Sequence, residues 1–535
     1  VQAQSDSKNQ VFDLLFAVLL KLLQTNQSDV TLVTTISLFK VLVRKFCFVF
    51  FYDTNSYSEK LIDHVLRMCH SSIEKVRNQA TALLYFLIKI NFETIGNFTR
   101  TKTQTTVALS NIATKLSQKS ISVLRTCFNV IAQYAKSDTI QKAPIENLSV
   151  KQFCIRYQRV VQEEEKKRNS MSGSPFPEQV QDLLERLGKT LTDTIGFNSL
   201  KNENADEEMK CDLLYRIATG YRHAPELSVT WFNNLAEENK TNKRFVEAAQ
   251  CKVYIAAVVI QYMKLSKVPI LQNADYDRLL KVAPMLKSEK FEELKALFQE
   301  QEKPAFQSRC FTREGLIELL NDAITLFNED SHFEYSVEIY KLFLQIHEAE
   351  RNYKAMSEVH NEMSKLYDYI ARSSIRLFGS YYRIYFSGHR LPEDIRDKAF
   401  IYKMPKIMKL SELIDYLKSH FGAKYGAENI EIVGESATIP TTTSDKCYIQ
   451  ICFVKPFIRV PESRVGFFEN NSCINEFTWE TPFTKGGASQ SSDLTAQYKR
   501  KTVVKVLGQF PCLMTRLQII AKEEKEVSPV GTSIE

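Results

Sequence analysis

The 535-residue sequence lacks most of the short motifs that carry chemistry. It has no GxGxxG, no GxSxG and no paired CxxC, and its eight histidines are scattered. These absences argue against a dinucleotide fold, an α/β-hydrolase and a zinc site. The "GKT" at 188–190 lacks the preceding glycine of a P-loop and follows a helical run. We therefore expect no bond-making enzyme, no catalytic residue, no metal and no cofactor.

Long apolar runs are also missing. The most apolar windows, at 11–23, 46–51 and 254–263, are shorter than the ~20 residues that span a bilayer. Eleven cysteines, an odd number, occur without a signal-like N-terminus, which indicates reduced thiols in a cytosolic protein. The net charge of +7 is a small excess over this length, so nucleic-acid binding is not implied. Because no initiator Met is present, we expect the chain to be part of a longer one.

Helical periodicity dominates what is present from residue 11 to residue 135. In "SIEKVRNQATALLYFLIKI" apolar residues recur at three- and four-residue steps on one helix face. This spacing resembles the second helix of HEAT or armadillo repeats, which stack into solenoids. An irregular helical bundle is the alternative for residues 1–150. The residues of the stripe are Val76, Ala80, Leu83, Leu84 and Leu87.

A polar stretch separates these helices from a second helical region. "EEEKKRNSMSGSPFP" carries charge, Ser, Gly and two Pro without periodicity, which predicts a flexible linker at 151–177. Helical patterns return over 178–375. The segment 245–263 is apolar nearly all round and predicts a buried central helix. Another helix is predicted by the stripe of Phe333, Val337, Tyr340 and Leu344.

The period of the pattern changes from 3.6 to 2 after about residue 376. In "KCYIQICFVKP" every second residue from Cys447 to Phe453 points one way, and Pro456 stops the run. Further strand candidates are "SYYRIYFSG", the text at 429–434, "RVGFF", "FTWETPF" and "RKTVVKVL". The fold class is therefore mainly α with a smaller antiparallel β unit.

Long collinear segments resemble a known family. "SPFPEQVQDLLERLGKTLTDT", "TWFNNLAEEN" followed by "EAAQC", "RLFGSYYRIYF", "FIYKMP", "YIQICFVKPF", "FTWETPFT" and "QYKRKTVVKVLGQFPCLMTR" follow in order. Together they resemble DOCK homology region two of the dedicator-of-cytokinesis exchange factors, in the zizimin-like branch. The resemblance covers roughly 175–535, and the helices before it are similar to the armadillo-like array of the family.

The resemblance implies a domain order. After the armadillo-like helices (1–150) and the linker (151–177), it implies a helical lobe A at 178–375 that supports the domain and often dimerises. A β-rich lobe B at 376–526, built from a pair of small antiparallel sheets, is the part that docks on the first switch of a Rho-family GTPase. Residues 527–535 resemble the start of lobe C, whose inserted Val senses the nucleotide. No residue of this chain matches that sensor.

The function that the resemblance implies is guanine nucleotide exchange on Rac, Cdc42 or both, within small-GTPase signalling to the cytoskeleton. A homodimer through the helical lobe is implied, and so is a cytoplasmic location with membrane recruitment by regions outside this chain. Without the sensor, this chain is expected to be weak or inactive alone. The alternatives are a helical-repeat scaffold or adaptor without exchange activity, and a divergent inactive member. Candidate dimer helices lie around 253–263 and 333–346.

The GTPase-binding residues are chosen from strand alternation. Alternate positions of two strands are expected to give one exposed aromatic and basic face, although a shift of one residue would invert the set. Two structural readings stay open, in which the aromatics are core of the β unit and Lys499–Lys501 guards an edge strand. The candidates are Phe477, Trp479, Thr481, Phe483, Lys499, Arg500 and Thr502, with Val527, Ser528 and Pro529 from the family's hydrophobic-Ser-Pro position.

Overall fold

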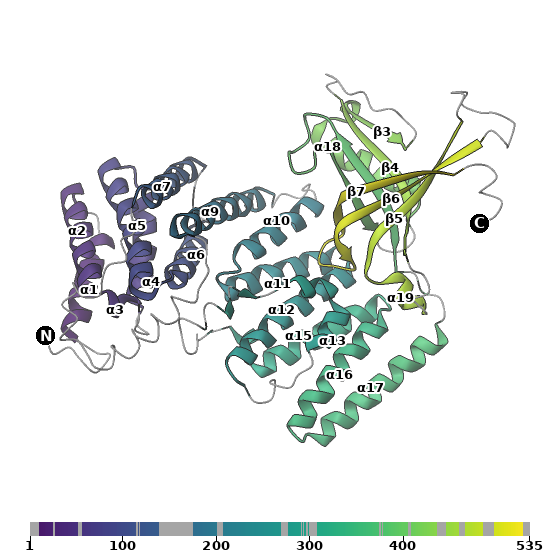
Figure 1. The fold of residues 1–535 in the computed structure, drawn as a ribbon, viewed down its shortest axis with the longest axis horizontal. Helices are drawn as coiled ribbons and strands as arrows, with labels where there is room; N and C mark the ends of the chain where they lie inside the picture. Colours follow the sequence, from purple (N-terminus) through teal and green to yellow (C-terminus); the bar gives the residue numbers. More distant parts are fainter. Residues whose placement is uncertain are drawn as a thin grey trace. The chain divides into compact units, whose positions relative to one another are not determined.

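The structure is a computed structural model, and its described residues divide into two compact units. It describes residues 10–24, 27–51, 56–113, 116, 118–138, 175–200, 207–268, 276–289, 291, 292, 294, 295, 298, 306, 308–373, 376, 378–404, 408–435, 446–459, 466–484 and 497–527. One unit contains the described residues up to 200 together with 213–231 and 291–306. The other contains those of 206–212, 232–290 and 307–535. Figure 1 gives the order of the elements along the chain.

The first unit is a stack of helices in two layers. α1, α4 and α6 follow one another in one layer, while α2, α5 and α7 follow in the other, and α9 packs on both α6 and α7. This is the HEAT/armadillo-like arrangement that the periodicity predicts. The helices are α1 (Gln10–Gln24), α2 (Asp29–Lys45), α3 (Cys47–Phe51), α4 (Tyr57–Cys69), α5 (Glu74–Ile95), α6 (Thr99–Ala113), α7 (Gln118–Ser137) and α9 (Phe176–Ser199).

The sequence of α5 explains its place in the stack. All five residues of the predicted apolar stripe are buried, with Leu83, Leu84 and Leu87 fully enclosed. The helix ends at Gly96, whose φ of 89° is a left-handed conformation that glycine adopts without steric cost. Its apolar face therefore contributes to one continuous core that extends from Phe16 to Leu191.

The predicted start of lobe A at residue 178 falls within a helix of the structure. Residue 178 lies inside α9, which begins at Phe176 and packs against helices of the first unit. Phe176 contacts Phe92 with ring centroids 4.7 Å apart, so the apolar start of the helix is sealed on α5. The rest of the predicted linker, 151–174, lies outside the described residues.

The second unit contains a helical part and a β part. In the helical part α12 packs against α15, α16 packs against α17, and α13 contacts α16. Two helices, α10 and α11, cross from one unit to the other along the chain. The elements are α10 (Glu207–Gly220), α11 (Pro225–Thr241), α12 (Phe245–Leu265), α13 (Tyr276–Val282), η4 (Pro284–Ser288), η5 (Arg309–Phe311), α15 (Arg313–Glu329), α16 (Phe333–Ala349) and α17 (Tyr353–Arg372).

α12 is the buried central helix that the sequence predicts. Fourteen of its residues are buried, Val253, Ile255 and Val259 completely. Its apolar surface is thus used inside the unit, and this burial explains its apolarity without a dimer surface. On α16 the buried face is Tyr335, Ile339, Leu342 and Ile346, whereas three of the four predicted stripe residues are only half buried.

The β part contains seven described strands in two hydrogen-bonded groups. β3, β4, β1 and β2 form one group and β5, β6 and β7 the other, and short pairings of β2 with β7 and β4 with β5 join them into a closed ring of six strands. β3 pairs with β4 in parallel outside this ring, and the other pairings are antiparallel. The strands are β1 (Ser380–Ser387), β2 (Lys398–Met404), β3 (Ile430–Gly434), β4 (Cys447–Pro456), β5 (Ile474–Thr484), β6 (Gln497–Phe510) and β7 (Arg516–Val527).

Three features of this part depart from the predicted strands. The amphipathic helix α18 (Leu410–Tyr425) covers the first strand group, with Leu413, Leu417 and Phe421 in its core. The text "RVGFF" is not a strand where it is described, because Phe467 and Phe468 begin the short helix α19 (Phe467–Asn471). Strands β2 and β7 were not predicted as strands.

Candidate functional site

The predicted site residues lie mainly on the β5–β6 hairpin. Cross-strand partners in an antiparallel pair share one face of the sheet. The register therefore defines a first face, made by Phe477, Trp479, Thr481 and Phe483 of β5 with Val504, Thr502, Arg500 and Tyr498 of β6.

The base of the first face is buried, which corrects the prediction of a fully exposed face. Phe477 has no exposed surface and contacts Tyr381 of β1, with ring centroids 4.9 Å apart. Trp479 is 6% exposed, and its partner Thr502 is also buried. The alternative reading, in which these aromatics are core of the β unit, therefore describes the base of the hairpin.

A buried arginine fixes the position of Trp479. The guanidinium of Arg383 on β1 lies 5.3 Å from the centroid of the Trp479 ring, a cation–π arrangement. The same guanidinium donates to the Oε1 atom of Gln450 at 3.0 Å and pairs with Glu435. Glu435 neutralises the charge of Arg383, and Gln450 fixes the orientation of its guanidinium group. Arg383 therefore holds the Trp479 ring in one position at the base of the hairpin.

The tip of the first face is accessible. Thr481 and Phe483 are half buried and Arg500 is exposed. The Arg500 guanidinium lies over the Phe483 ring at 5.1 Å, and the Phe483 and Tyr498 ring centroids are 5.9 Å apart. The tip thus presents two aromatic rings and a cation, which are residue types enriched at protein interfaces.

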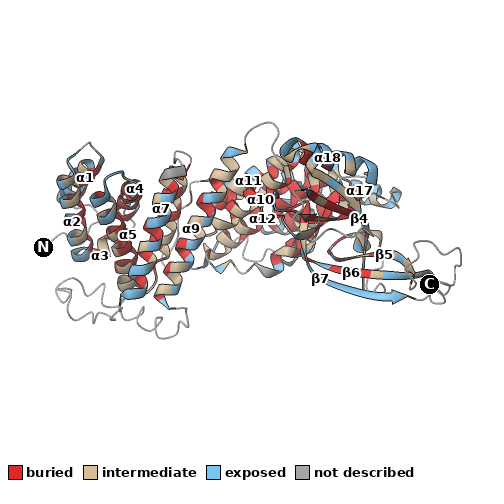
Figure 2. Cartoon of the chain, turned by 90° about the horizontal axis from the view of Figure 1, so that it is seen from above, coloured by how far each residue is buried: buried red, intermediate tan, exposed pale blue. Residues whose placement is uncertain are grey.

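Lys499 lies on the opposite face, which is a second correction. It pairs in register with Pro482, and its Nζ atom is 3.2 Å from the Glu480 carboxylate. β6 is also flanked by β5 and β7, so Lys499–Lys501 does not guard a sheet edge. The outer side of β7 is one of the edges that the structure describes, and charged residues are exposed there over 522–526 (Figure 2).

The remaining predicted residues lie at the end of β7. Val527 is the last residue of the strand and pairs in register with Lys499. Ser528 and Pro529 lie outside the described residues.

Buried ion pairs attach the β part to the helical part within the second unit. Lys403 of β2 donates to the Oε1 atom of Glu247 on α12 at 2.7 Å, and each side chain is 5% exposed. Burial lowers the pKa of Lys403, but the Glu247 carboxylate together with Tyr381 and Asp330 outweighs burial and raises the pKa above the ordinary value. The Lys403 ammonium therefore stays charged, and its bond to Glu247 attaches the sheet to α12.

The start of β7 and the turn before it make two further attachments to the helices. Arg516 pairs with Asp212 of α10 and donates to the Tyr402 hydroxyl at 2.7 Å. The Asn239 side chain of α11 donates to the Leu513 carbonyl at 3.2 Å. These polar contacts give the hairpin a fixed base from which its tip projects.

Two buried cysteines and a buried histidine are held uncharged. Burial raises the pKa of the Cys211 and Cys512 thiols to about 12, so they are not reactive thiolates. Burial lowers the pKa of His332 to about 3, with Lys403 and Arg376 adding to the effect. The ten cysteines that the structure describes are free.

Over the ranges described, no cluster of three His, Cys, Asp or Glu side chains has the geometry to hold a metal ion. None of the described helices has the length and apolarity to cross a membrane.

Sequence reasoning missed Arg383 and Tyr498. Strand alternation would have added Tyr498, since it is two residues before Arg500. No sequence signal identifies Arg383, because Trp479 is 96 positions away along the chain and the two meet only when the ring of strands closes.

Two family models match parts of the chain. Residues 212–372 match the family described as DHR-2, Lobe A, and residues 436–509 match DHR-2, Lobe B. Dedicator of cytokinesis protein 8 of Mus musculus is 32% identical over 546 residues, which cover 100% of this chain and 24% of that protein.

Two further relatives give similar coverage. Dedicator of cytokinesis protein 7 of Mus musculus is 32% identical over 99% of this chain and 24% of its own length. Dedicator of cytokinesis protein 9 of Mus musculus is 26% identical over 98% of this chain and 25% of its own length. The chain spans about a quarter of the length of the curated relatives it matches.

Proposed function

Because the chain belongs to the dedicator-of-cytokinesis family, we propose that it is part of a guanine nucleotide exchange factor for the Rho-family GTPases Rac, Cdc42 or both. The observation that carries the proposal is the collinear match of lobe A and lobe B within one chain. In this proposal the residues of the chain supply the support and the switch-docking surface, and displacement of the nucleotide is assigned to none of them.

Exchange needs no acid, base or nucleophile. A GTPase that holds GDP with nM to pM affinity does so with about −12 to −16 kcal/mol. An exchange factor lowers that affinity by binding the nucleotide-free form more tightly, and this coupling acts equally in both directions. A rigid, complementary protein surface is therefore what the function requires.

The tip of the β5–β6 hairpin is the best candidate for that surface. We assign contact with the GTPase to Thr481, Phe483 and Arg500, which are accessible and share one face. Phe477, Trp479 and Thr502 act from beneath as positioning residues. Lys499 contributes only if the partner reaches the opposite face, and Val527–Pro529 stays a proposal from the family pattern.

Other parts of the proposal rest on the family alone. They are the domain order (1–150, 151–177, 178–375, 376–526, 527–535), a homodimer through the helical lobe, and a cytoplasmic location with recruitment to membranes by regions outside this chain. The matched ranges 212–372 and 436–509 lie within the proposed lobes A and B.

Binding and exchange are tested separately. The chain is titrated into nucleotide-free Rac and Cdc42 in a binding assay, and release of a fluorescent GDP is followed with the same proteins. We expect binding to at least one GTPase with little acceleration of release. If this chain released GDP at the full rate of an exchange factor, the proposal that none of its residues displaces the nucleotide would be refuted. Absence of binding to both GTPases would favour a helical-repeat scaffold.

A further inference from the structure

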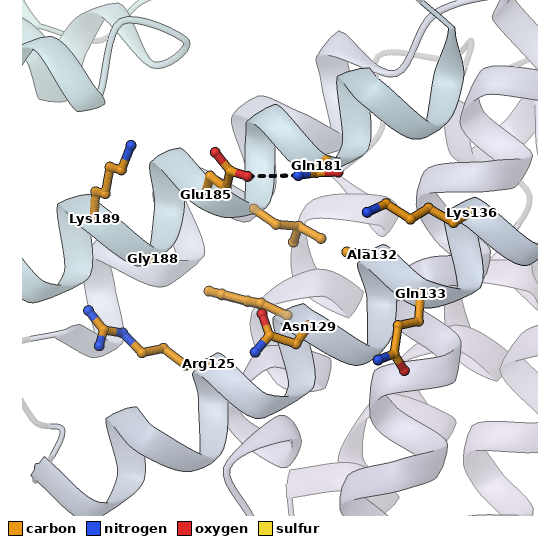
Figure 3. A pocket seen from close by; sticks show the side chains of 11 residues that line it. Arg125, Asn129, Ala132, Gln133, Lys136, Gln181, Glu185, Gly188 and Lys189 are labelled. Carbon is orange, nitrogen blue, oxygen red and sulfur yellow. Dashed lines mark hydrogen bonds between the residues drawn. The ribbon is translucent and has the colours of Figure 1, made fainter.

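A groove of about 560 Å³ lies between α7 and α9 in the first unit, far from any residue assigned to GTPase binding in the sequence. The buried side chains of Phe128 and Leu184 contribute to its lining. Polar side chains of both helices complete the lining (Figure 3). It takes no part in the proposed exchange function.

The hollow exists because two small residues face it. Ala132 of α7 and Gly188 of α9 line the groove where larger side chains would fill the space between the helices. A Cβ atom added to Gly188 would meet nothing within 4 Å, so close packing does not demand glycine. Glycine inside a helix costs about 1 kcal/mol relative to alanine. Gly188 therefore lowers the stability of α9, and no close contact at this position requires a glycine.

The charges around the groove are unbalanced. Arg125 and Lys189 lie toward one end and Lys136 toward the other, while Glu185 is the single carboxylate of the lining (Figure 3). Glu185 is already engaged by the Gln181 amide at 2.9 Å. Neither Lys136 nor Lys189 has an ion-pair partner within the part of the chain that the structure describes. Eleven residues of α7 separate Arg125 from Lys136, which is about 16 Å along a helix.

The amides in the lining indicate the form of the ligand. Asn129 and Gln133 lie one turn apart on α7, and both contribute to the lining of the groove. A side-chain amide both donates and accepts, which matches the unpaired main-chain groups of an extended peptide. A helical ligand already satisfies its own backbone groups and has no use for them.

From these observations we propose that the α7–α9 groove binds an extended acidic peptide of a partner protein. One apolar side chain of the peptide fills the hollow over Ala132 and Gly188, and carboxylates on either side of it pair with the cations at the two ends. Five residues of extended chain span about 16 Å, so the two acidic residues are five positions apart.

The test uses the 535-residue chain and a fluorescein-labelled peptide containing Glu-Ser-Leu-Ser-Ser-Glu, with fluorescence anisotropy as the readout at low salt. We expect saturable binding, weakened about tenfold or more by Gly188→Trp, which fills the hollow. The Lys136→Glu, Lys189→Glu double variant should lose the peptide and instead bind Lys-Ser-Leu-Ser-Ser-Lys. Exposed Lys75 on α5 supplies the matched control, Lys75→Glu, which should change neither affinity. Circular dichroism verifies that each variant folds.

Three results would overturn the proposal. They are no binding of the acidic peptide up to millimolar concentration, binding that Gly188→Trp leaves unchanged, and failure of the charge-reversed variant to accept the charge-reversed peptide. Vesicles containing phosphatidylserine serve as a separate arm. Binding of vesicles without peptide, abolished by the double lysine variant, would replace the peptide with a membrane surface.

Discussion

The two units are held together in different ways. In the first unit each helix packs on its neighbours through an apolar core, and the described ion pairs of Lys89 and Arg186 lie near the surface. In the second unit, ion pairs join segments far apart in sequence. Both side chains of the Glu247–Lys403 pair are buried, and the buried Arg516 pairs with the partly exposed Asp212. The comparison teaches that local apolar patterns suffice for a stack of helices, whereas a closed ring of strands depends on specific distant partners.

The largest expected effect comes from breaking a buried pair in the second unit. Glu247→Ala leaves the Lys403 ammonium buried and unpaired, which should lower the free energy of unfolding by about 3–5 kcal/mol. Urea unfolding is followed by the fluorescence of Trp479, which lies in this unit. The other tryptophan, Trp231, is replaced by Phe so that it does not contribute to the signal. The double variant Glu247→Leu, Lys403→Met should recover most of the loss. A cost below 1 kcal/mol for the single variant would contradict the comparison.

A core truncation tests the first unit. Leu84 is fully buried on α5, and Leu84→Ala should cost about 3 kcal/mol through lost apolar contact and a residual cavity. Trp231 lies in the first unit, so the same titration in a Trp479→Phe background measures the effect. Lys89→Ala, which removes a surface ion pair of the same helix, is the matched control and should cost less than about 1 kcal/mol. Equal costs for the two changes would contradict an apolar origin of this unit's stability.

Acid should affect both units alike, despite their different packing. Burial lowers the pKa of His223 in the first unit to about 2 and that of His332 in the second to about 3. Below the unfolded-state pKa of about 6.5 the unfolded chain takes up a proton that the folded chain does not. Stability therefore falls as pH falls, by about 1.4 kcal/mol per pH unit for each histidine, or about 2 kcal/mol between pH 6.5 and 5.

Histidine substitutions locate this effect. Urea unfolding at pH 7 and pH 5, read by Trp231 for His223→Gln and by Trp479 for His332→Gln, should show a smaller loss on acidification than the parent chain does. His360, on α17 and exposed, provides the control His360→Gln, which should leave the pH dependence unchanged. A parent chain equally stable at both pH values would contradict the buried neutral state of both histidines.

The smallest effect on stability is expected at the tip of the hairpin. Phe483→Ala and Arg500→Ala remove accessible side chains, so each should change unfolding by less than about 1 kcal/mol. If the tip docks on a GTPase, each should weaken binding of the nucleotide-free form about tenfold. The matched control for binding is Leu507→Ala. Leu507 is exposed and lies on β6 with Arg500, but toward the other end of that strand. Unchanged affinity in both tip variants would move the docking surface elsewhere.

The sequence predicted correctly those helices and strands whose structure follows from the local pattern of apolar residues. The stripe of α5, the all-round burial of α12 and the alternation in β4 follow from local periodicity, and the family followed from long collinear segments. The α18 segment was missed because its helical period lies inside a region already read as strands. In β2 and β7, apolar and polar residues do not alternate clearly along the sequence. Hydrogen bonding to neighbouring strands of the ring defines them instead.

The candidate site was only partly accessible to the same reasoning. Strand alternation correctly placed Phe477, Trp479, Thr481 and Phe483 on one face of β5. It cannot tell which end of that face other strands cover. Coverage at Trp479 comes from Arg383 on another strand, and the position of Lys499 depends on a register that the sequence does not encode locally. Exposure at a strand face is a property of the assembled sheet.

Closure of the strand ring has a consequence for synthesis on the ribosome. β2 contacts β7 through the pairing of Tyr402 with Arg516, so 114 further residues must leave the exit tunnel before the free side of β2 finds its partner. Until then its hydrogen-bonding groups are exposed in a nascent chain whose helices have already begun to pack. At translation rates of about 5–20 residues per second that interval lasts about 6 to 23 seconds, which is time enough for a chaperone to occupy the open strand.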